Sequence, residues 1–176
     1  KTLTTTKTTL YKALLHDSDN LVAESIVLML SGTAQWELNT QKGLEMLYQQ
    51  NKTLKSQFQQ VDGSGLSRYN LASPRGLLET LDKIYETIGS TNIKTLFPQA
   101  NSVGTLYDYA PKQVLDYVYA KSGSLNNNHL LAGFIFSASK KNYAFVISVT
   151  NYTGDKQAVQ EAIGAQLSII YNKLIY

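Results

Sequence analysis

The hydrophobic pattern of this chain changes near Pro111, and that change limits the folds that are open to it. Before this point apolar residues recur at intervals of three and four, which is typical of amphipathic helices. After it, segments rich in β-branched and aromatic residues predict strands at 114–120, 130–139 and 143–150. A helical pattern then returns after Asp155. We therefore expect an α+β fold, with helices followed by a three-stranded antiparallel sheet segment and a C-terminal helix.

Three helices are expected in the first part of the chain, divided by residues that favour caps and turns. Apolar spacing predicts one helix that ends before the polar cluster 16–20, a second that starts at Leu21 and a third over 40–50. The polar cluster then lies in a tight junction between two helices.

The next helix and the last one are bounded by stronger signals. Ser73 is a good N-cap, Pro74 suits the first helical position and Gly89 supplies a terminator. The pattern over 90–110 is irregular, and Asp155 is the expected cap of the C-terminal helix. The side chains predicted to form the buried face of that last helix are Val159, Ala162, Ile163, Gln166, Leu167, Ile170 and Leu174.

Composition excludes several classes of site. The 176 residues contain no cysteine, which excludes disulfides, thiolate nucleophiles and zinc sites built from Cys. The net charge is only +3 and the only arginines are Arg68 and Arg75, so nucleic acid is not an expected partner. The longest apolar stretches fall far short of the ~20 residues that a transmembrane helix needs. The chain begins at Lys1 without Met, and we interpret it as a processed chain or a fragment.

Two short motifs carry residues that suit acyl transfer. Ser18-Asp19-Asn20 falls at the predicted junction of two helices, and Lys121-Ser122-Gly123 falls at the predicted end of the first strand. Each pattern alone is weak. Together, and on these elements, they match two of the three motifs of the penicillin-recognising serine enzymes, S-D-N and K-T/S-G.

The second motif fits a site for an extended peptide that ends in a carboxylate. Lys121 would supply positive charge in a partly dry site, and the Ser122 hydroxyl would donate to the same carboxylate. Gly123 lets a substrate backbone approach the strand closely, so that a peptide can pair with the sheet edge. The N–H of Ser124 would point to the position where an oxyanion forms.

The first motif fits proton transfer and amide binding. The Ser18 hydroxyl can relay a proton, and the Asn20 amide can both donate and accept hydrogen bonds. We therefore predict catalytic roles for Ser18, Asn20 and Lys121 and substrate-binding roles for Ser122, Gly123 and Ser124. No metal site and no cofactor is predicted.

Each of these features also has a purely structural interpretation. Ser18 and Asn20 can serve as helix caps, and Lys121–Ser124 can be a plain turn after a strand. The loop Asp62–Asn70 can be Gly/Ser turn chemistry and no more. The joint occurrence of the motifs favours the functional interpretation over any single structural one.

The joint pattern resembles one known family. Its segments occur in this order: 14–24 (LLHDSDNLVAE), 62–71 (DGSGLSRYNL) and 121–125 (KSGSL) followed by 131–134 (LAGF). They are similar to the C-terminal portion of a class C low-molecular-mass penicillin-binding protein, the D-alanyl-D-alanine carboxypeptidase/endopeptidase family (peptidase family S13). The resemblance runs from about Leu10 to Tyr152, and the run DGSGLSR is its most specific part.

The resemblance implies a fold, an activity and a location. The chain would be the C-terminal part of a transpeptidase domain of serine β-lactamase type, with a mostly helical portion over 1–110 and strands with a helix over 111–176. The intact protein would be a periplasmic serine D-Ala-D-Ala carboxypeptidase/endopeptidase that cleaves peptidoglycan peptide stems through an acyl-enzyme. It would also be acylated by β-lactam antibiotics.

The chain departs from the family at the nucleophile. The family uses the Ser of an S-x-x-K motif upstream of the S-x-N motif. Here the only S-x-x-K is Ser137-Ala138-Ser139-Lys140, in the predicted hairpin, which we interpret as coincidence. We therefore expect the nucleophile and its Lys in an N-terminal remainder of the same protein, and we expect this chain alone to be inactive.

Two other functions stay open at this point. A class A-type serine β-lactamase shares both motifs, but no general-base Glu is placed suitably, since Glu37 lies too near Ser18. A non-catalytic peptidoglycan-binding domain of the same fold would keep the motifs without forming a covalent adduct. His16 and His129 carry no metal-ligand spacing, and we predict surface or capping roles for them.

Overall fold

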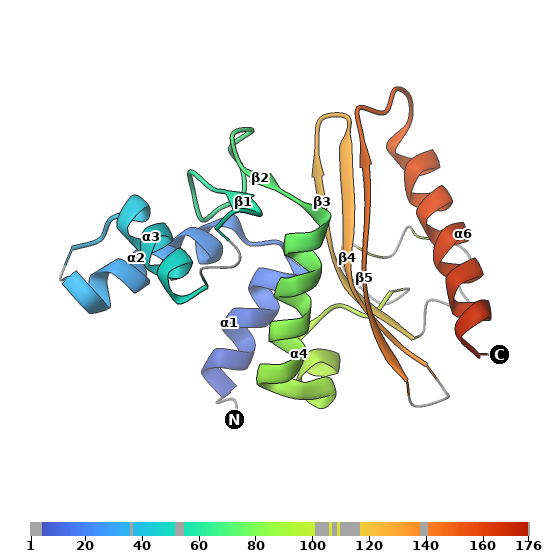
Figure 1. Ribbon diagram of the computed structural model, residues 1–176, viewed down its shortest axis with the longest axis horizontal. Coiled ribbons are helices and arrows are strands. Elements are labelled where there is room, and N and C mark those ends of the chain that lie inside the picture. The colour runs from blue at the N-terminus through green and yellow to red at the C-terminus, as the bar shows by residue number, and fades with distance from the viewer. Residues whose placement is uncertain are drawn as a thin grey trace. The chain divides into compact units, whose positions relative to one another are not determined.

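The computed structural model describes residues 5–35, 37–51, 55–100, 106, 109, 117–137 and 141–175 (Figure 1). The chain divides into two compact units, Thr2–Thr80 and Leu81–Tyr176. The boundary falls inside one helix, after Thr80.

The N-terminal unit is mostly helical. Its elements are α1 (Thr5–His16), α2 (Asn20–Gln35), α3 (Thr40–Gln50), β1 (Phe58–Gln59), β2 (Leu71–Ala72) and the start of α4 (Pro74–Leu96). α2 packs on both α1 and α3, and β1 pairs with β2 in antiparallel fashion. The bounds of α3 agree with the predicted helix over 40–50. The junction predicted at 16–20 is confirmed, because α1 ends at His16 and α2 begins at Asn20.

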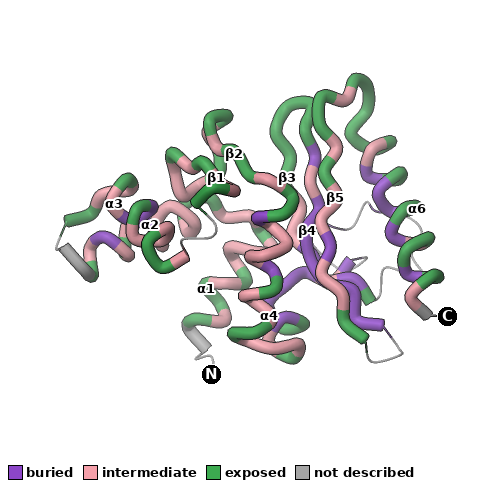
Figure 2. The backbone as a smooth tube through the Cα atoms, in the orientation of Figure 1, coloured by how far each residue is buried: buried purple, intermediate pink, exposed green. Residues whose placement is uncertain are grey.

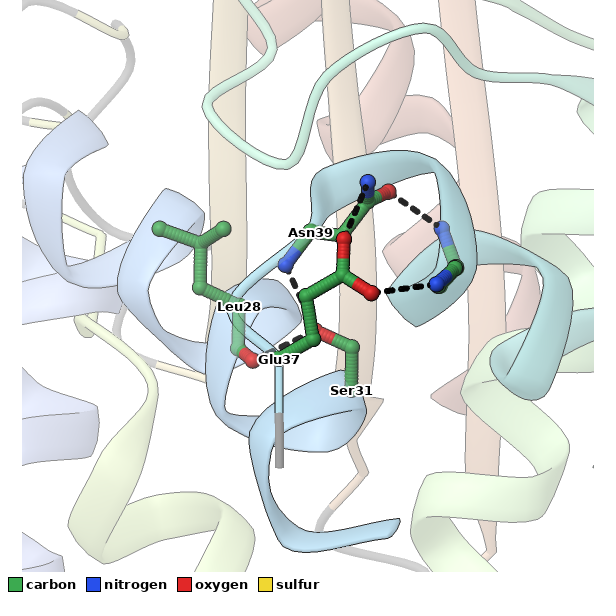
Figure 3. A network of polar contacts seen from close by, with 5 residues as sticks. Leu28, Ser31, Glu37 and Asn39 are labelled. Carbon is green, nitrogen blue, oxygen red and sulfur yellow. Dashed lines mark hydrogen bonds and ion pairs between the residues drawn. The ribbon is translucent and has the colours of Figure 1, made fainter. Parts of the chain in front are cut away.

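A polar network joins the end of α2 to the start of α3 (Figure 3). The buried Ser31 hydroxyl donates to the carbonyl of Leu28 (2.8 Å) and accepts from the N–H of Asn39 (2.9 Å). The Asn39 side chain in turn accepts from the N–H of Lys42 (3.0 Å) and so caps α3. Lys42 also forms an ion pair with Glu37. This network fixes the turn between the two helices.

The predicted start of α4 is confirmed, and Gly89, the predicted terminator, is a kink from which the helix continues. The Ser73 hydroxyl accepts from the N–H of Gly76 (3.0 Å), which makes Ser73 the N-cap. Gly89 has φ 72° and ψ 169°, a conformation that glycine adopts far more readily than other residues, and it kinks the helix. The prediction of irregular structure from residue 90 onward is wrong for its first turns, because helix resumes and runs to Leu96.

The C-terminal unit is built on a three-stranded antiparallel sheet. Its described elements are β3 (Val118–Leu125), β4 (Asn128–Phe136), β5 (Asn142–Thr150) and α6 (Lys156–Ile175), with the strands in the order β3-β4-β5. The α+β class is therefore confirmed, with five helices and this sheet among the described residues. Residues 114–116 of the first predicted strand lie outside the described residues. That strand was placed too early, because the pairing with β4 continues through Leu125.

One face of the sheet forms the main core with α6 (Figure 1). Buried residues follow β4 and one side of α6 (Figure 2), and the Asp155 side chain caps the helix by accepting from Gln157 N–H (3.1 Å). The predicted face of α6 was partly wrong. The described residues of α6 that are buried in this core are Ile163, Leu167 and Tyr171, whereas Ala162, Gln166 and Ile170 are exposed.

The opposite face of the sheet is covered by aromatic rings and the second half of α4. Phe134 of β4 meets Phe97 edge-on, with ring centroids 5.6 Å apart, and lies 6.2 Å from Tyr85. The Lys94 ammonium lies 4.6 Å from the ring centroid of Phe136. Both faces of β4 are thus buried, and the strand is the centre of this unit.

We predict that Gly133→Ala separates β3 from β4. A Cβ at Gly133 would lie 2.2 Å from the carbonyl oxygen of Tyr119 and 2.5 Å from Cα of Ala120, and backbone atoms cannot move aside cheaply. The expected loss is about 2 kcal/mol in the free energy of unfolding, measured by urea denaturation. Gly123→Ala in the neighbouring strand is the control, because its Cβ would meet no atom within 4 Å. Equal stability of the two variants would contradict the strand packing described above.

Candidate active site

The Ser18-Asp19-Asn20 motif forms the turn between α1 and α2. Ser18 has φ 56°, in the left-handed region that costs a non-glycine residue about 1–2 kcal/mol. The carbonyl of Ala13 accepts from the N–H of Asp17 and from that of Asp19 (both 3.2 Å), which ends α1. A strained serine held at this turn is the kind of backbone outlier that clusters at functional sites.

Asp19, and neither of its neighbours, caps α2. Its Oδ1 accepts from the N–H of Leu21 (2.9 Å) and of Val22 (3.0 Å). The interpretation of Ser18 and Asn20 as helix caps is therefore wrong. Ser18 is half-buried and Asn20 is exposed, which leaves both polar groups able to meet a ligand.

Glu24 ties the loop Asp62–Asn70 to α2, one helical turn after Asn20. One carboxylate oxygen of Glu24 accepts from the N–H of Gly63 (2.7 Å) and of Ser64 (3.0 Å), and the other accepts from the Thr40 hydroxyl (2.5 Å). Since residues four apart lie on one face of a helix, the loop is anchored on the face that begins with Asn20. The loop is therefore more than local turn chemistry.

Asp62 organises the same loop from inside. Its carboxylate accepts from the N–H of Gly65 (2.7 Å), the N–H of Ser67 (2.9 Å) and the side-chain amide of Asn70 (2.9 Å). Burial raises the pKa of Asp62, but these hydrogen bonds, with one from Ser64, outweigh burial and lower the pKa below its ordinary value. The carboxylate therefore stays ionised and keeps the loop closed.

The Lys121-Ser122-Gly123-Ser124 segment lies inside β3, not after it. Its residues pair in register with Ala132, Leu131, Leu130 and His129 of β4, in that order. The interpretation as a plain turn is therefore wrong, and so is the placement of the motif at the end of the strand. The turn comes later, at 126–127, after Leu125 has paired with Asn128.

Among the described residues, partners on the outer edge of β3 reach only as far as Ala120, the residue before the motif. The N–H of Ala100 donates to the carbonyl of Val118 (2.9 Å), and the N–H of Ala120 donates to the carbonyl of Pro98 (3.1 Å). Beyond Ala120, none of the residues that the structure describes pairs with this edge. Within the described part of the chain, the edge of the sheet is therefore unpaired from Lys121 onward.

Strand alternation decides which backbone groups meet the open edge. Val118 and Ala120 bond outward, whereas the carbonyl of Tyr117 accepts from the N–H of Phe136 in β4 (2.9 Å). Backbone direction alternates along a strand. The backbone groups of Ser122 and Ser124 therefore face the outer edge of β3, on the same side as those of Val118 and Ala120.

Lys121 is half-buried, and no carboxylate of the described residues pairs with it. Its ammonium donates to the carbonyl of Ser122 (2.5 Å), and burial lowers its pKa. The one ion pair found in the described part of the chain joins Lys42 and Glu37. A cation that is partly desolvated and unpaired beside an open strand edge favours an anionic ligand.

Gly123 is not required by the fold. A Cβ at this position would meet no atom within 4 Å, and the residue is not in the left-handed region. Neither packing nor backbone conformation therefore requires a glycine at this position in the strand.

His129 is a residue whose place the sequence analysis missed. It is only 2% exposed. Its Nδ1 shares a hydrogen bond with the Ser124 hydroxyl (2.7 Å), and its Nε2 shares one with the Tyr109 hydroxyl. The prediction of a surface or capping histidine is wrong for His129. The available signal was alternation along β4, which places residue 129 on the same face as Leu131 and Ile135.

Ser137, the serine of the S-x-x-K pattern, lies at the end of β4. Ser137 directly follows β4, is 7% exposed, and its N–H donates to the carbonyl of Lys141 (3.1 Å). The rest of its S-x-x-K pattern, residues 138–140, lies outside the described residues.

His16 ends α1 with its Nε2 buried. Within the described ranges no three His, Asp or Glu side chains form a metal-binding group, and no helix is long and apolar enough to cross a membrane.

The predicted site residues are divided between the units. Ser18 and Asn20 belong to the N-terminal unit, together with Glu24 and the loop Asp62–Asn70. Lys121–Ser124 and His129 belong to the C-terminal unit.

Comparison with known proteins identifies relatives over most of the chain. The D-alanyl-D-alanine carboxypeptidase DacB of Haemophilus influenzae is 31% identical over 159 residues, which cover 85% of this chain and 33% of that protein. The penicillin-sensitive carboxypeptidase A of Dictyostelium discoideum is 28% identical over 172 residues, which cover 92% of this chain and 33% of that protein. The chain thus spans about a third of the length of these relatives.

Solved structures share the fold. Penicillin binding protein 4 of Haemophilus influenzae, in complex with a β-lactam, matches with a TM-score of 0.75 and 29% identity over 95% of this chain and 41% of that one. The extended-spectrum β-lactamase TLA-1 matches with a TM-score of 0.68 over 96% of this chain and 64% of that one, and at 16% identity it supports the fold alone.

The model of the D-Ala-D-Ala carboxypeptidase 3 (S13) family matches residues 7–173, nearly the whole chain. The fold agrees with that match. The chain belongs to the D-Ala-D-Ala carboxypeptidase 3 (S13) family.

Proposed function

We propose that this chain is part of a periplasmic serine D-Ala-D-Ala carboxypeptidase/endopeptidase that acts on peptidoglycan peptides through an acyl-enzyme. The nucleophilic serine and its lysine partner would lie outside residues 1–176. The observation that carries the proposal is the strand edge of β3, which opens at Lys121 and directs the backbone of Ser122 and Ser124 outward.

An extended peptide with a terminal carboxylate suits this edge. The Lys121 ammonium has no carboxylate partner among the described residues, and burial destabilises its charged form. A substrate carboxylate would form an ion pair with it and so stabilise that charge. The Ser122 hydroxyl would donate to the same carboxylate. The N–H of Ser124 would donate to the carbonyl oxygen as it gains negative charge, which is the interaction that most lowers the barrier in acyl transfer.

The first motif would supply the proton transfers. The Ser18 hydroxyl is half-buried in a strained turn, and we assign to it the relay of a proton to the leaving amine. The exposed Asn20 amide would bind the substrate amide, because it offers both a donor and an acceptor. Asp19 would keep both in place through its hold on the start of α2.

β-Lactams would act as substrates that are released slowly. They present an amide-like carbonyl and a carboxylate, as a peptide terminus does, and the matched penicillin binding protein 4 was solved with a β-lactam. A lactamase activity is less well supported. Glu37, the acid considered for a general base, forms an ion pair with Lys42 at the start of α3, and the Lys42 side chain lowers its pKa.

Fluorescent penicillin tests the proposal on the full-length protein. The parent should form a covalent band, and Lys121→Ala should acylate roughly 100–1,000-fold more slowly, because a preorganised charge in a site is lost. Lys141→Ala, an exposed lysine before β5, is the matched control and should label like the parent. A parent that does not label while a known penicillin-binding protein does would favour a non-catalytic peptidoglycan-binding domain. Rapid turnover of penicillin would favour the lactamase.

The pH dependence of acylation should report the buried lysine. Because burial lowers the pKa of Lys121, its positive charge is lost as the pH rises through a value below the ordinary one of about 10.4. Acylation should therefore fall on the alkaline side, and in Lys121→Arg the fall should move to higher pH, since a guanidinium stays charged. Stopped-flow acylation between pH 7 and 11 measures this. An alkaline limb that is identical in both proteins would remove Lys121 from carboxylate binding.

Gly123→Ala should separate function from stability. The new methyl group meets no protein atom within 4 Å, so the free energy of unfolding should stay within about 0.5 kcal/mol of the parent. A ligand backbone that approaches the strand would meet that methyl group, and acylation should fall at least about tenfold, since small misplacements are costly. Labelling at the parent rate would show that no ligand comes close to Gly123.

A further inference from the structure

A buried hydrogen-bond chain runs from Ser124 through His129 to Tyr109. His129 and Tyr109 are 2% and 1% exposed, so they lie in the core of the C-terminal unit, whereas Ser124 lies on the exposed part of β3. None of the roles proposed above requires a histidine or a tyrosine here. The polar residues are therefore unexplained by packing alone, because a leucine would fill the same space without a desolvation cost.

The strand register brings the first two members together. Ser124 and His129 are direct partners in the β3–β4 pairing. Because the backbone of Ser124 bonds toward the open edge, this is a pair without mutual backbone hydrogen bonds, in which the two Cα atoms and side chains come closest. The distance of 2.7 Å between Ser124 Oγ and His129 Nδ1 follows from that geometry.

The second nitrogen of the ring is fixed by Tyr109. The two rings lie with centroids 5.9 Å apart, and the Tyr109 hydroxyl bonds to Nε2. A neutral imidazole has one donor and one acceptor nitrogen, and two hydroxyls can serve both. With both nitrogens engaged, the ring has one orientation, and it can hold the Ser124 hydroxyl in one place.

The surroundings keep this ring neutral. Burial lowers the pKa of His129, and the positive charge of Lys156 at the start of α6 lowers it further. The β5 partner of His129 in the register is Val149, which is apolar. On β3, Lys121 leaves the opposite face from Ser124, since the two are an odd number of residues apart. Neutrality preserves the pairing of one donor and one acceptor nitrogen.

The part of β3 that carries Ser124 needs such an anchor. Beyond Ala120 the strand is paired on one side only among the described residues, and the hairpin turn follows at 126–127. An edge strand near its turn frays readily. An oxyanion donor must hold its position closely, because a displacement of about 1 Å can cost roughly 100-fold in rate.

We propose that His129 and Tyr109 are positioning residues that hold Ser124, and with it the Ser124 N–H, at the open edge of β3 for the oxyanion of a bound acyl group. The inference rests on the proposed function. His129 and Tyr109 do not touch the substrate. They act by holding the Ser124 side chain on the α6 face of the sheet. The backbone N–H of the same residue then keeps a fixed position at the outer edge of β3.

Two variants of the full-length protein test the chain from its buried end. Tyr109→Phe removes the hydroxyl that fixes Nε2, and His129→Leu removes both bonds. We expect acylation by penicillin at saturating concentration to fall roughly tenfold in the first and roughly 100-fold in the second, below the loss for removing an oxyanion donor outright. The half-saturating penicillin concentration should change less than about threefold, because carboxylate binding at Lys121 is kept.

A conservative variant and a matched control separate positioning from stability. His129→Asn can keep a hydrogen bond to Ser124 and should recover most of the rate lost in His129→Leu. Tyr171→Phe removes the hydroxyl of a tyrosine that is also buried in the same core, 5% exposed against 1% for Tyr109, and that bonds to Tyr117, away from the motif. It should cost similar stability in thermal melts and leave acylation at the parent rate.

The outcomes distinguish this inference from the function on which it rests. If the parent labels and Tyr109→Phe and His129→Leu acylate like Tyr171→Phe, the positioning role is overturned and the proposed function stands. The role is also overturned if the variants change only the half-saturating concentration, or if His129→Asn recovers nothing. If the parent does not label, the proposed function fails and this inference falls with it.

Discussion

The antiparallel register of β3 on β4 sets the chemistry of the C-terminal unit. It places the residues of the Lys121–Ser124 segment so that alternate backbone groups bond to β4 and to the outer edge. It also sets Ser124 opposite His129 in the pair geometry where side chains approach most closely. A shift of one residue in this register would turn the backbone groups of Ser122 and Ser124 toward β4 and would move the Ser124 side chain to the other face of the sheet, because side chains and backbone bonds alternate with the same period.

The fold resists that shift through the central strand. β4 is buried on both faces, by α6 with its Ile163 and Leu167 on one side and by the aromatic contacts of Phe134 on the other. Gly133 leaves no room between the strands for anything larger than a hydrogen atom. The unit thus combines a well-packed centre with a strand edge that, among the described residues, has no partner beyond Ala120, an arrangement that suits the pairing of an extended ligand.

Local signals explain what could be predicted from the sequence. The start and the kink of α4 were predictable because they depend on local backbone geometry. The Ser73 hydroxyl accepts from an N–H three residues later, and the backbone of Gly89 itself leaves the helical conformation. The course of β3 was not predictable, because Lys121 to Ser124 have little intrinsic strand preference and are held there by pairing with β4.

The same division holds for the candidate site. The motif residues could be named from their spacing, and Lys121 was expected to sit in a partly dry place. The left-handed turn at Ser18 and the buried bonds of His129 depend on contacts that spacing does not encode. A single histidine in a sequence gives no indication of its partners, and only the register of two strands supplies them.

The Glu24 carboxylate holds two segments to α2. It binds the loop Asp62–Asn70 and the Thr40 hydroxyl of α3 to the helix that starts with Asn20. One carboxylate therefore makes both attachments to α2, and its loss would leave the N–H groups of Gly63 and Ser64 and the Thr40 hydroxyl without their acceptor at the same time.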